Sequence, residues 1–224
     1  MMTNCFDYKA ADRQYFGGRL GADCTPERTA FRVWQPFAEN VDLRLYNANN
    51  ILIFSAPMEK KNGVFEYEKT GDLDGVFYAF SVTRNGETVE SADPYSAAVT
   101  ADGGRGQIVD MRRHAPEGWE SERNISVENP IMYERSVSDF SMDESADFAS
   151  RGKFHAFCEE NVKNSHGDIV GLDYIKKLGI THLQLMPIFD FDLDGGEYNW
   201  GYNPRFYNAP SVHYSRSDGV RELR

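Results

Sequence analysis

The sequence has few cysteines, a shortage of positive charge and no long apolar run, and each shortage excludes a class of protein. Its three cysteines, Cys5, Cys24 and Cys158, are far apart and form no CxxC pair, which favours reduced thiols over disulfides or a thiolate metal site. Lys and Arg total 24 against 35 Asp and Glu, and the net charge of −11 argues against nucleic acid or an anionic membrane as the partner. No stretch approaches the roughly 18 apolar residues of a membrane span, and the first residues lack the pattern of a signal peptide, so we expect a cytoplasmic protein.

Motifs for a metal, a cofactor or a catalytic pair are also scarce, and we expect no cofactor and no metal. No GxGxxG, Walker or GxSxG motif occurs, and the histidines show neither HxH nor HExxH spacing. Residues 190–195 (DFDLDG) begin like a calcium loop, but Gly201 stands where such a loop needs a bidentate carboxylate, so a solvated acidic loop is the default interpretation. Glu134 and Asp139 would face opposite sides of an extended strand, so they cannot act together as a catalytic carboxylate pair. We therefore assign no catalytic residue.

The pattern in the first half of the chain predicts an all-β domain. Apolar residues make up 41% of the sequence and aromatic residues 13%, which is typical of a globular protein. Val41, Leu43 and Leu45 alternate with polar neighbours, as in a half-buried strand. The dipeptide Asn85-Gly86 between two apolar runs predicts a type I′ hairpin. Short strands separated by turn residues favour an immunoglobulin-like β-sandwich.

The composition divides the chain into four segments. Residues 1–20 have little periodicity and form a lead-in, and residues 21–115 form the sandwich. Residues 116–130 are polar, lack an apolar face and are predicted to be a linker. Residues 131–224 follow a different rhythm and are predicted to form a second domain.

The second domain opens with the pattern of a βαβ unit. Strands are expected at 131–140 and 183–188, separated by a long polar connection and a short helix. Leu172, Ile175 and Leu178 fall on one stripe of that helix, and a glycine follows as its stop signal. Such a unit is parallel and right-handed almost without exception.

Several motifs, taken in order along the chain, resemble those of one enzyme family. Residues 198–204 (YNWGYNP) closely resemble the YNWGYDP signature of type I pullulanases, the α-1,6-debranching members of the α-amylase superfamily. The other segments that resemble this family are FRVWQP at 31–36, GDLDGVFY at 71–78, DPY at 93–95, IMYE at 131–134, DFS at 139–141, RGKF at 151–154 and GLDY through FDF at 171–191. Their order and spacing over most of the chain make chance agreement very improbable.

The resemblance implies a carbohydrate-binding-type sandwich followed by the first βαβ of an incomplete (β/α)8 TIM barrel. The family's nucleophile, general acid and third carboxylate lie on later strands and have no counterpart before Arg224, so we expect a fragment that lacks hydrolytic activity by itself. Three positions depart from the family: Ser136 and Ser138 stand where His and Arg are usual, and Asn203 replaces an Asp.

The resemblance also implies a sugar-binding loop. In the family the residue that matches Tyr202 stacks beneath the sugar at the cleavage point, and Asn203, Trp200 and Asn199 are further candidates for substrate binding. For Tyr202 the alternative to sugar contact is a structural role, in which the ring only packs against the loop. For Trp200 the alternative is burial within the loop. Trp34 is a candidate glucan platform, although packing in the core or at a domain interface suits its strand position better.

Two functions remain open. The first is part of a pullulanase-type hydrolase whose partner is an α-glucan polysaccharide or oligosaccharide. The second is a non-catalytic glucan-binding protein in which the sandwich supplies the function.

Overall fold

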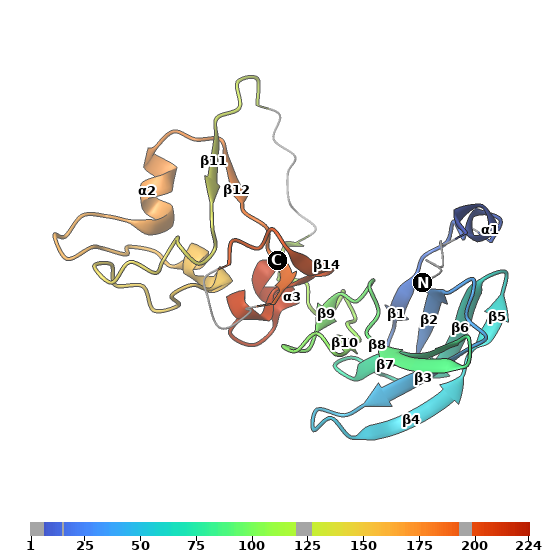
Figure 1. The fold of residues 1–224 in the computed structure, drawn as a ribbon. Coiled ribbons are helices and arrows are strands. Elements are labelled where there is room, and N and C mark those ends of the chain that lie inside the picture. The colour runs from blue at the N-terminus through green and yellow to red at the C-terminus, as the bar shows by residue number, and fades with distance from the viewer. Residues whose placement is uncertain (1–6, 15, 120–126, 193–198) are drawn as a thin grey trace. The chain divides into compact units, whose positions relative to one another are not determined.

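The structure, a computed structural model, describes residues 7–14, 16–119, 127–192 and 199–224. The chain divides into two compact units, Met1–Arg113 and His114–Arg224 (Figure 1). The segment boundaries predicted at 115 and 130 stay predictions, because residues 120–126 of the expected linker lie outside the described part.

The first unit is a β-structure preceded by one short helix. Its elements are α1 (Tyr8–Asp12), β1 (Gly21–Cys24), β2 (Arg28–Trp34), β3 (Asn40–Tyr46), β4 (Leu52–Pro57), β5 (Glu59–Lys61), β6 (Val64–Thr70), β7 (Phe77–Arg84), β8 (Glu87–Ser91), β9 (Ala98–Val99) and β10 (Gly106–Gln107). One sheet has the order β1-β2-β6-β5, and the other has the order β4-β3-β7-β10-β9 with β8 beside β7. All the pairings in both sheets are antiparallel.

The local sequence signals of this unit are confirmed. Val41, Leu43 and Leu45 on β3 are buried, while the polar residues between them are half-buried. Asn85 and Gly86 have φ values of 52° and 75°, which is the left-handed geometry of a type I′ turn, and they join β7 to β8.

One hydrophobic core lies between the two sheets. Its largest members, Phe31 from one sheet and Leu43, Tyr78 and Phe80 from the other, are almost completely removed from water. Each such side chain contributes about 1.5–3 kcal/mol by burial. Each sheet has one apolar face, and the two faces pack against each other and are buried, as the alternation in the sequence predicts.

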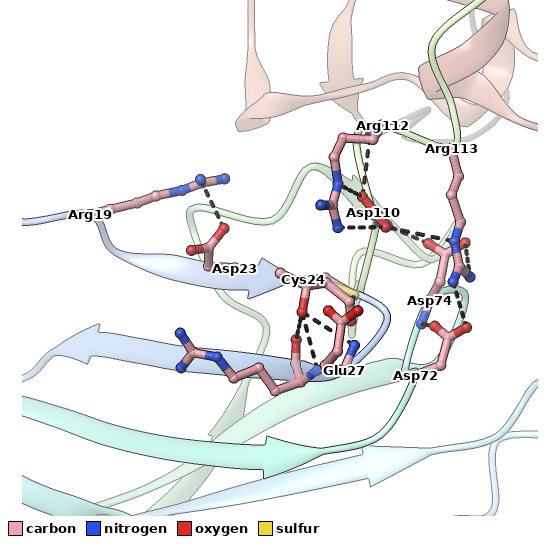
Figure 2. Close-up of polar contacts among 11 residues, drawn as sticks. Arg19, Asp23, Cys24, Glu27, Asp72, Asp74, Asp110, Arg112 and Arg113 are labelled. Atoms are coloured by element: carbon pink, nitrogen blue, oxygen red, sulfur yellow. Dashed lines mark hydrogen bonds and ion pairs between the residues drawn. The ribbon is translucent and has the colours of Figure 1, made fainter.

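A network of charges closes the end of the sandwich where the chain leaves it (Figure 2). Arg112 binds both carboxylate oxygens of Asp110, at 2.9 and 3.0 Å, and Arg113 reaches Asp72 at 2.7 Å. The Asp110 backbone N–H donates to the Asp74 carboxylate at 2.8 Å. The Arg112 hydrogen bonds hold the pKa of Asp110 below its usual value. These aspartates are therefore neutralised by arginines and fix the exit of the chain.

The second unit contains the predicted parallel βαβ arrangement. Its elements are β11 (Met132–Arg135), η2 (Phe154–Cys158), α2 (Gly171–Lys177), β12 (His182–Leu185), β13 (Phe189–Phe191), β14 (Pro204–Pro210), η4 (Val212–Tyr214) and α3 (Gly219–Leu223). Strands β11 and β12 pair in parallel and in register, and α2 lies on the connection between them (Figure 1). Gly179, with φ 72°, follows the end of α2 as expected for a C-terminal stop.

The first strand of this unit is shorter than predicted. It ends at Arg135, whereas we expected it to continue to about Phe140. The buried Ser136 turns the chain, because its carbonyl accepts from the Phe140 N–H at 3.2 Å and its hydroxyl accepts from the Asp139 N–H at 3.3 Å. The prediction that Glu134 and Asp139 share one extended strand is therefore wrong.

We predicted a long polar connection after β11. In the structure this connection instead folds around a small hydrophobic core of its own. Phe140, Phe148, Ala156 and Val162 are buried together with Ile175 of α2. Phe140 stacks on the half-buried Phe157, with ring centroids 3.9 Å apart. The sequence hides this core because its aromatic residues follow neither a period of two nor one of 3.6.

The second predicted strand, expected at 183–188, ends early, at Leu185. The Met186 N–H donates to the Arg135 carbonyl at 2.9 Å, but Pro187 has no N–H with which to continue the ladder to β11. The chain then pairs antiparallel with β14 as β13, and Ile188 lies outside both strands. A second small core around Val137, Phe154, Phe191 and Tyr214 supports this antiparallel pair. No helix in the described part is long and apolar enough to cross a membrane.

Candidate functional site

The candidate loop between β13 and β14 exposes two aromatic side chains. Trp200 is 58% exposed and Tyr202 is 62% exposed. Tyr198 and residues 193–197 of this loop lie outside the described part of the chain, while residues 199–203 are described. Exposed rings that are held on a structured turn can stack on the apolar C–H face of a sugar.

Asn199 holds the turn together through both ends of its amide. Its Nδ2 donates to the Asp192 carbonyl at 3.2 Å and to Asn203 Oδ1 at 2.9 Å. Its Oδ1 accepts from the Gly201 N–H at 2.7 Å. The Asn199 side chain is therefore engaged within the loop, while the exposed Asn203 contributes only its Oδ1 to that network.

Gly201 lets the loop approach the end of the second parallel strand. Its φ is +81°, and a Cβ at this position would lie 2.5 Å from the Pro187 carbonyl oxygen. Real Cβ atoms do not approach backbone oxygens so closely, and positive φ is unfavourable for residues with a side chain. Both features explain why glycine stands between Trp200 and Tyr202.

The Tyr202 hydroxyl connects the loop to the parallel sheet. It donates to Glu134 Oε1 at 3.3 Å, and Gln184 Nε2 donates to the same oxygen at 3.4 Å. Glu134 on β11 and Gln184 on β12 are register partners in the parallel ladder. Partial loss of water and the Glu134 carboxylate together raise the pKa of Tyr202. The structure thus brings together three segments that are far apart in the sequence.

Glu134 and Gln184 are the residues of this cluster that sequence reasoning missed. The sequence presents Glu134 only as one half of a rejected carboxylate pair with Asp139. A usable signal was nevertheless available, because parallel strands paired from 132 and from 182 place Glu134 beside Gln184 near their common carboxyl end. No periodicity, however, indicates where the hydroxyl of a loop tyrosine lies.

A buried ion pair lies behind the loop. Asp190 is 0% exposed, and its Oδ2 accepts from Arg205 Nε at 3.1 Å and from Arg205 Nη2 at 3.0 Å. Burial raises the pKa of Asp190, and the Arg205 guanidinium opposes that shift. The ion pair joins β13 to β14 immediately after the Tyr202 turn.

The acidic segment that begins like a calcium loop is only partly described. Asp194 and Gly195 lie outside the described residues, while Asp190 and Asp192 both face Arg205. Among the described residues there is no cluster of three His, Cys, Asp or Glu side chains that could hold a metal ion.

The three departures from the family pattern differ in their surroundings. Ser136 is buried at the turn after β11, and Ser138 is half-buried. Ser138 supplies a carbonyl that accepts from the Ser141 N–H at 3.3 Å. Asn203 is exposed and is tied to Asn199. The two serines therefore lie in the turn after β11, and Asn203 is the only one of the three departures in the candidate loop.

Trp34 belongs to the other unit and lies at the end of β2 in the sandwich. It is half-buried, and its indole N–H donates to the Gln14 carbonyl at 2.7 Å. The polar edge of the indole is therefore used to hold the lead-in segment.

The sandwich has an open cavity of about 370 Å³. Its lining includes Asn47, Asn50, Phe77, Asp102 and Arg105. Arg105, one of the lining residues, hydrogen-bonds Asn50. Amides, a carboxylate, a guanidinium and one ring form a lining that suits a polyhydroxylated ligand. Sequence reasoning missed this cavity, because its residues come from separate loops and strand ends.

Known proteins resemble this chain at two levels, first in the sandwich and then over almost the whole chain. Residues 19–96 match the family model described as carbohydrate-binding module 48 (isoamylase N-terminal domain). The sandwich is therefore similar to the carbohydrate-binding-module class over most of its length. The whole chain is 34% identical to the pullulanase of Bacillus subtilis, over 95% of this chain and 30% of that protein.

Solved structures of pullulanases agree with this assignment. The pullulanase from Bacillus acidopullulyticus matches with a TM-score of 0.87 and 36% identity, over 94% of this chain and 28% of that one. The pullulanase from Paenibacillus barengoltzii, solved with maltohexaose and α-cyclodextrin, matches with a TM-score of 0.89 and 34% identity, over 97% of this chain and 36% of that one. The resemblance to pullulanases predicted from the motifs is confirmed, and the chain spans about a third of the length of these relatives.

Proposed function

We propose that this chain is part of a pullulanase-type hydrolase that cleaves α-1,6 bonds in pullulan, glycogen or limit dextrins. In this proposal residues 21–115 are the carbohydrate-binding-type module, and residues 131–224 open the (β/α)8 barrel. The observation that carries the proposal is the exposed Tyr202 beside Glu134, near the carboxyl end of β11. The carboxyl ends of the parallel strands are the side on which barrels of this type bind their substrates. The pullulanase identity over nearly the whole chain supports the same function.

The loop residues then have separate tasks. The Tyr202 ring stacks on the apolar face of a glucose unit, and Trp200 extends the aromatic surface. Asn203 donates from its Nδ2 to a sugar hydroxyl, while Asn199 holds the turn in shape. The solved complex of a related pullulanase with maltohexaose supports an α-glucan as the ligand. We assign no nucleophile or general acid to residues 1–224.

The test is a titration with maltotriose followed on one residue. The sequence has three tryptophans, so the indole N–H resonance of Trp200 can be identified by comparison with a Trp200→Phe variant. We expect this resonance to shift on titration, and Tyr202→Ala to weaken the affinity about threefold to tenfold. Tyr207→Ala is the matched control, because Tyr207 is also exposed but lies along β14.

Two outcomes of this experiment count against the proposal. An unmoved Trp200 resonance at high maltotriose concentration would remove the loop from the sugar site. Equal affinity of the Tyr202→Ala and wild-type chains would remove Tyr202. The same sample should release no reducing ends from pullulan above a buffer blank, since no catalytic carboxylate is assigned within it.

The cavity of the sandwich favours a second candidate function, glucan binding by the module itself. Its lining of Asn47, Asn50 and Asp102 around Phe77 supports this candidate, as does the match to carbohydrate-binding module 48. An Asp102→Ala variant that loses retention on a pullulan gel, while Tyr202→Ala retains it, would favour this function over the first.

A further inference from the structure

Glu134 has a side chain that the fold itself does not require. It is exposed on β11, and the backbone ladder to β12 already fixes the register of the strand. No cation pairs with its carboxylate within the described part of the chain. An exposed carboxylate of this kind contributes little to folding stability.

The two oxygens of Glu134 have different surroundings. Oε1 receives both protein donors, the Tyr202 hydroxyl at 3.3 Å and Gln184 Nε2 at 3.4 Å. Oε2 has no protein donor among the described residues, and the side chain faces solvent beside the exposed Tyr202 ring. One oxygen is therefore held by the protein, while the other is without a protein donor among the described residues and remains able to accept a hydrogen bond.

We propose that Glu134 is a substrate-contact residue that also positions Tyr202. Oε1 fixes the angle of the Tyr202 ring through the phenol O–H, and Oε2 accepts a hydroxyl at the edge of the sugar that lies on the ring. The inference rests on the proposed function, because it requires a glucan at the Tyr202 loop. A carboxylate beside a ring is well suited to a neutral polyol, since hydrogen bonds to a charged acceptor are stronger than those between neutral groups.

The arrangement has a consequence for the tyrosine hydroxyl. The ring alone would carry the contact if Tyr202 stood free, and Tyr202→Phe would then bind as well as the wild type. With Glu134 as its acceptor, the hydroxyl is part of the site. Gln184 remains in both cases and holds Oε1 from the second strand.

The test is a double-mutant cycle read by maltotriose titration of the Trp200 indole resonance. The variants are Glu134→Gln, Tyr202→Phe and the two combined. We expect Glu134→Gln to weaken binding about tenfold and Tyr202→Phe about threefold, with the double variant close to Glu134→Gln. The losses are not additive, because the hydroxyl acts through Glu134.

Four further measurements separate positioning from general damage. Glu144→Gln removes one exposed charge from the same unit, and it should bind like the wild type. Glu134→Asp keeps the charge but shortens the side chain by one methylene, and it should also weaken binding. In ring-labelled tyrosine NMR spectra, Glu134→Gln should shift Tyr202 deprotonation to lower pH. Melting temperatures of all the variants should match that of the wild type.

The outcomes distinguish the inference from the function beneath it. No binding by the wild type would overturn the proposed function and this inference with it. Binding that is weakened by Tyr202→Ala but unchanged by Glu134→Gln would overturn only the inference. Fully additive losses, or a Tyr202 titration that does not respond to Glu134→Gln, would overturn the positioning role.

Discussion

The sandwich and the βαβ unit differ in how completely the residues of their strands are buried. In the sandwich four of the seven residues of β3 are buried, and one core of twelve buried residues joins two sheets. In the second unit none of the eight residues of β11 and β12 is buried, and the cores contain six and four buried residues. The sandwich therefore buries the apolar faces of its own sheets, while the parallel pair of strands β11 and β12 does not bury its faces.

The difference follows from strand direction. Antiparallel sheets can leave one face in water, and two of them are sufficient for a core. Parallel strands normally have both faces covered, and one βαβ unit supplies cover for only one. Ile131 just before β11, Met132 at its start and Leu178 after α2 remain exposed for this reason.

The largest expected difference between the units is in protection against local opening. Amides of β2, β3, β6 and β7 should exchange with solvent at least about a hundredfold more slowly than those of β11 and β12. Limited proteolysis should correspondingly trim the chain to a core that ends near residues 110–130. Hydrogen exchange with mass spectrometry measures both units in one sample. A protease-resistant piece that contains residues 131–224 but lacks the sandwich would reverse the comparison.

The next effect concerns the core of the sandwich. Leu43 is 0% exposed, and Leu43→Ala should lower the free energy of unfolding by about 2–5 kcal/mol because it leaves a cavity between the sheets. Leu52→Ala, on the exposed edge strand β4, is the matched control and should change it by less than about 0.5 kcal/mol. Urea denaturation followed by circular dichroism measures both. Equal effects of the two substitutions would show that the sandwich core is not closed.

The next prediction compares the stability cost of replacing one turn glycine in each unit, Gly86 in the sandwich and Gly201 in the candidate loop. Gly86 in the sandwich hairpin has φ +75°, and a Cβ added there would meet no atom within 4 Å, so Gly86→Ala should cost only the backbone strain, about 1 kcal/mol. Gly201 has φ +81° and the Pro187 carbonyl in the way, so Gly201→Ala should cost more, about 2 kcal/mol. It should also weaken maltotriose binding, because Trp200 and Tyr202 flank it. Urea denaturation and the Trp200 titration measure the two effects. Equal costs, with unchanged binding, would mean that the loop does not rest on Pro187.

The sequence predicted those features that depend on local periodicity. The alternation in β3, the Asn85-Gly86 turn and the Gly179 stop each require only a few neighbouring residues, and the structure contains all three. The end of β11 was missed because the hydroxyl of Ser136 competes with the ladder for a backbone N–H. The early end of the second strand at Leu185 was missed although Pro187 signalled it, since proline cannot donate to a ladder.

The candidate site was predicted only as far as a motif extends. Tyr202 and Trp200 come from one short string of sequence, and the structure exposes both. Glu134 lies 68 residues away from Tyr202 in the sequence, and its contact depends on where the loop folds back. The resemblance to pullulanases predicted the loop, but it did not predict that the Glu134 carboxylate contacts Tyr202.

The smallest expected effect concerns buried charge within the sandwich. Asp93 is 0% exposed, and it accepts from the Tyr78 hydroxyl at 2.8 Å and from the Tyr95 N–H at 2.9 Å. Burial raises its pKa, and no cation pairs with it among the described residues. A raised pKa in the folded state means that Asp93 favours folding below the unfolded pKa of about 3.9, and that this contribution is lost as the pH rises through the folded pKa.

Asp93→Asn should therefore gain stability relative to the wild type as the pH rises from about 4 to 7, by about 1 kcal/mol or less. Asp110→Asn is the control of opposite sign. Arg112 lowers the pKa of Asp110, so its contribution is present above the unfolded pKa and is lost as the pH falls. Asp110→Asn should accordingly lose stability relative to the wild type over the same rise. Urea titrations of the three proteins at both pH values measure the two slopes. Slopes of the same sign would mean that burial of Asp93 is not what raises its pKa, because burial without a cation is the feature that distinguishes it from Asp110.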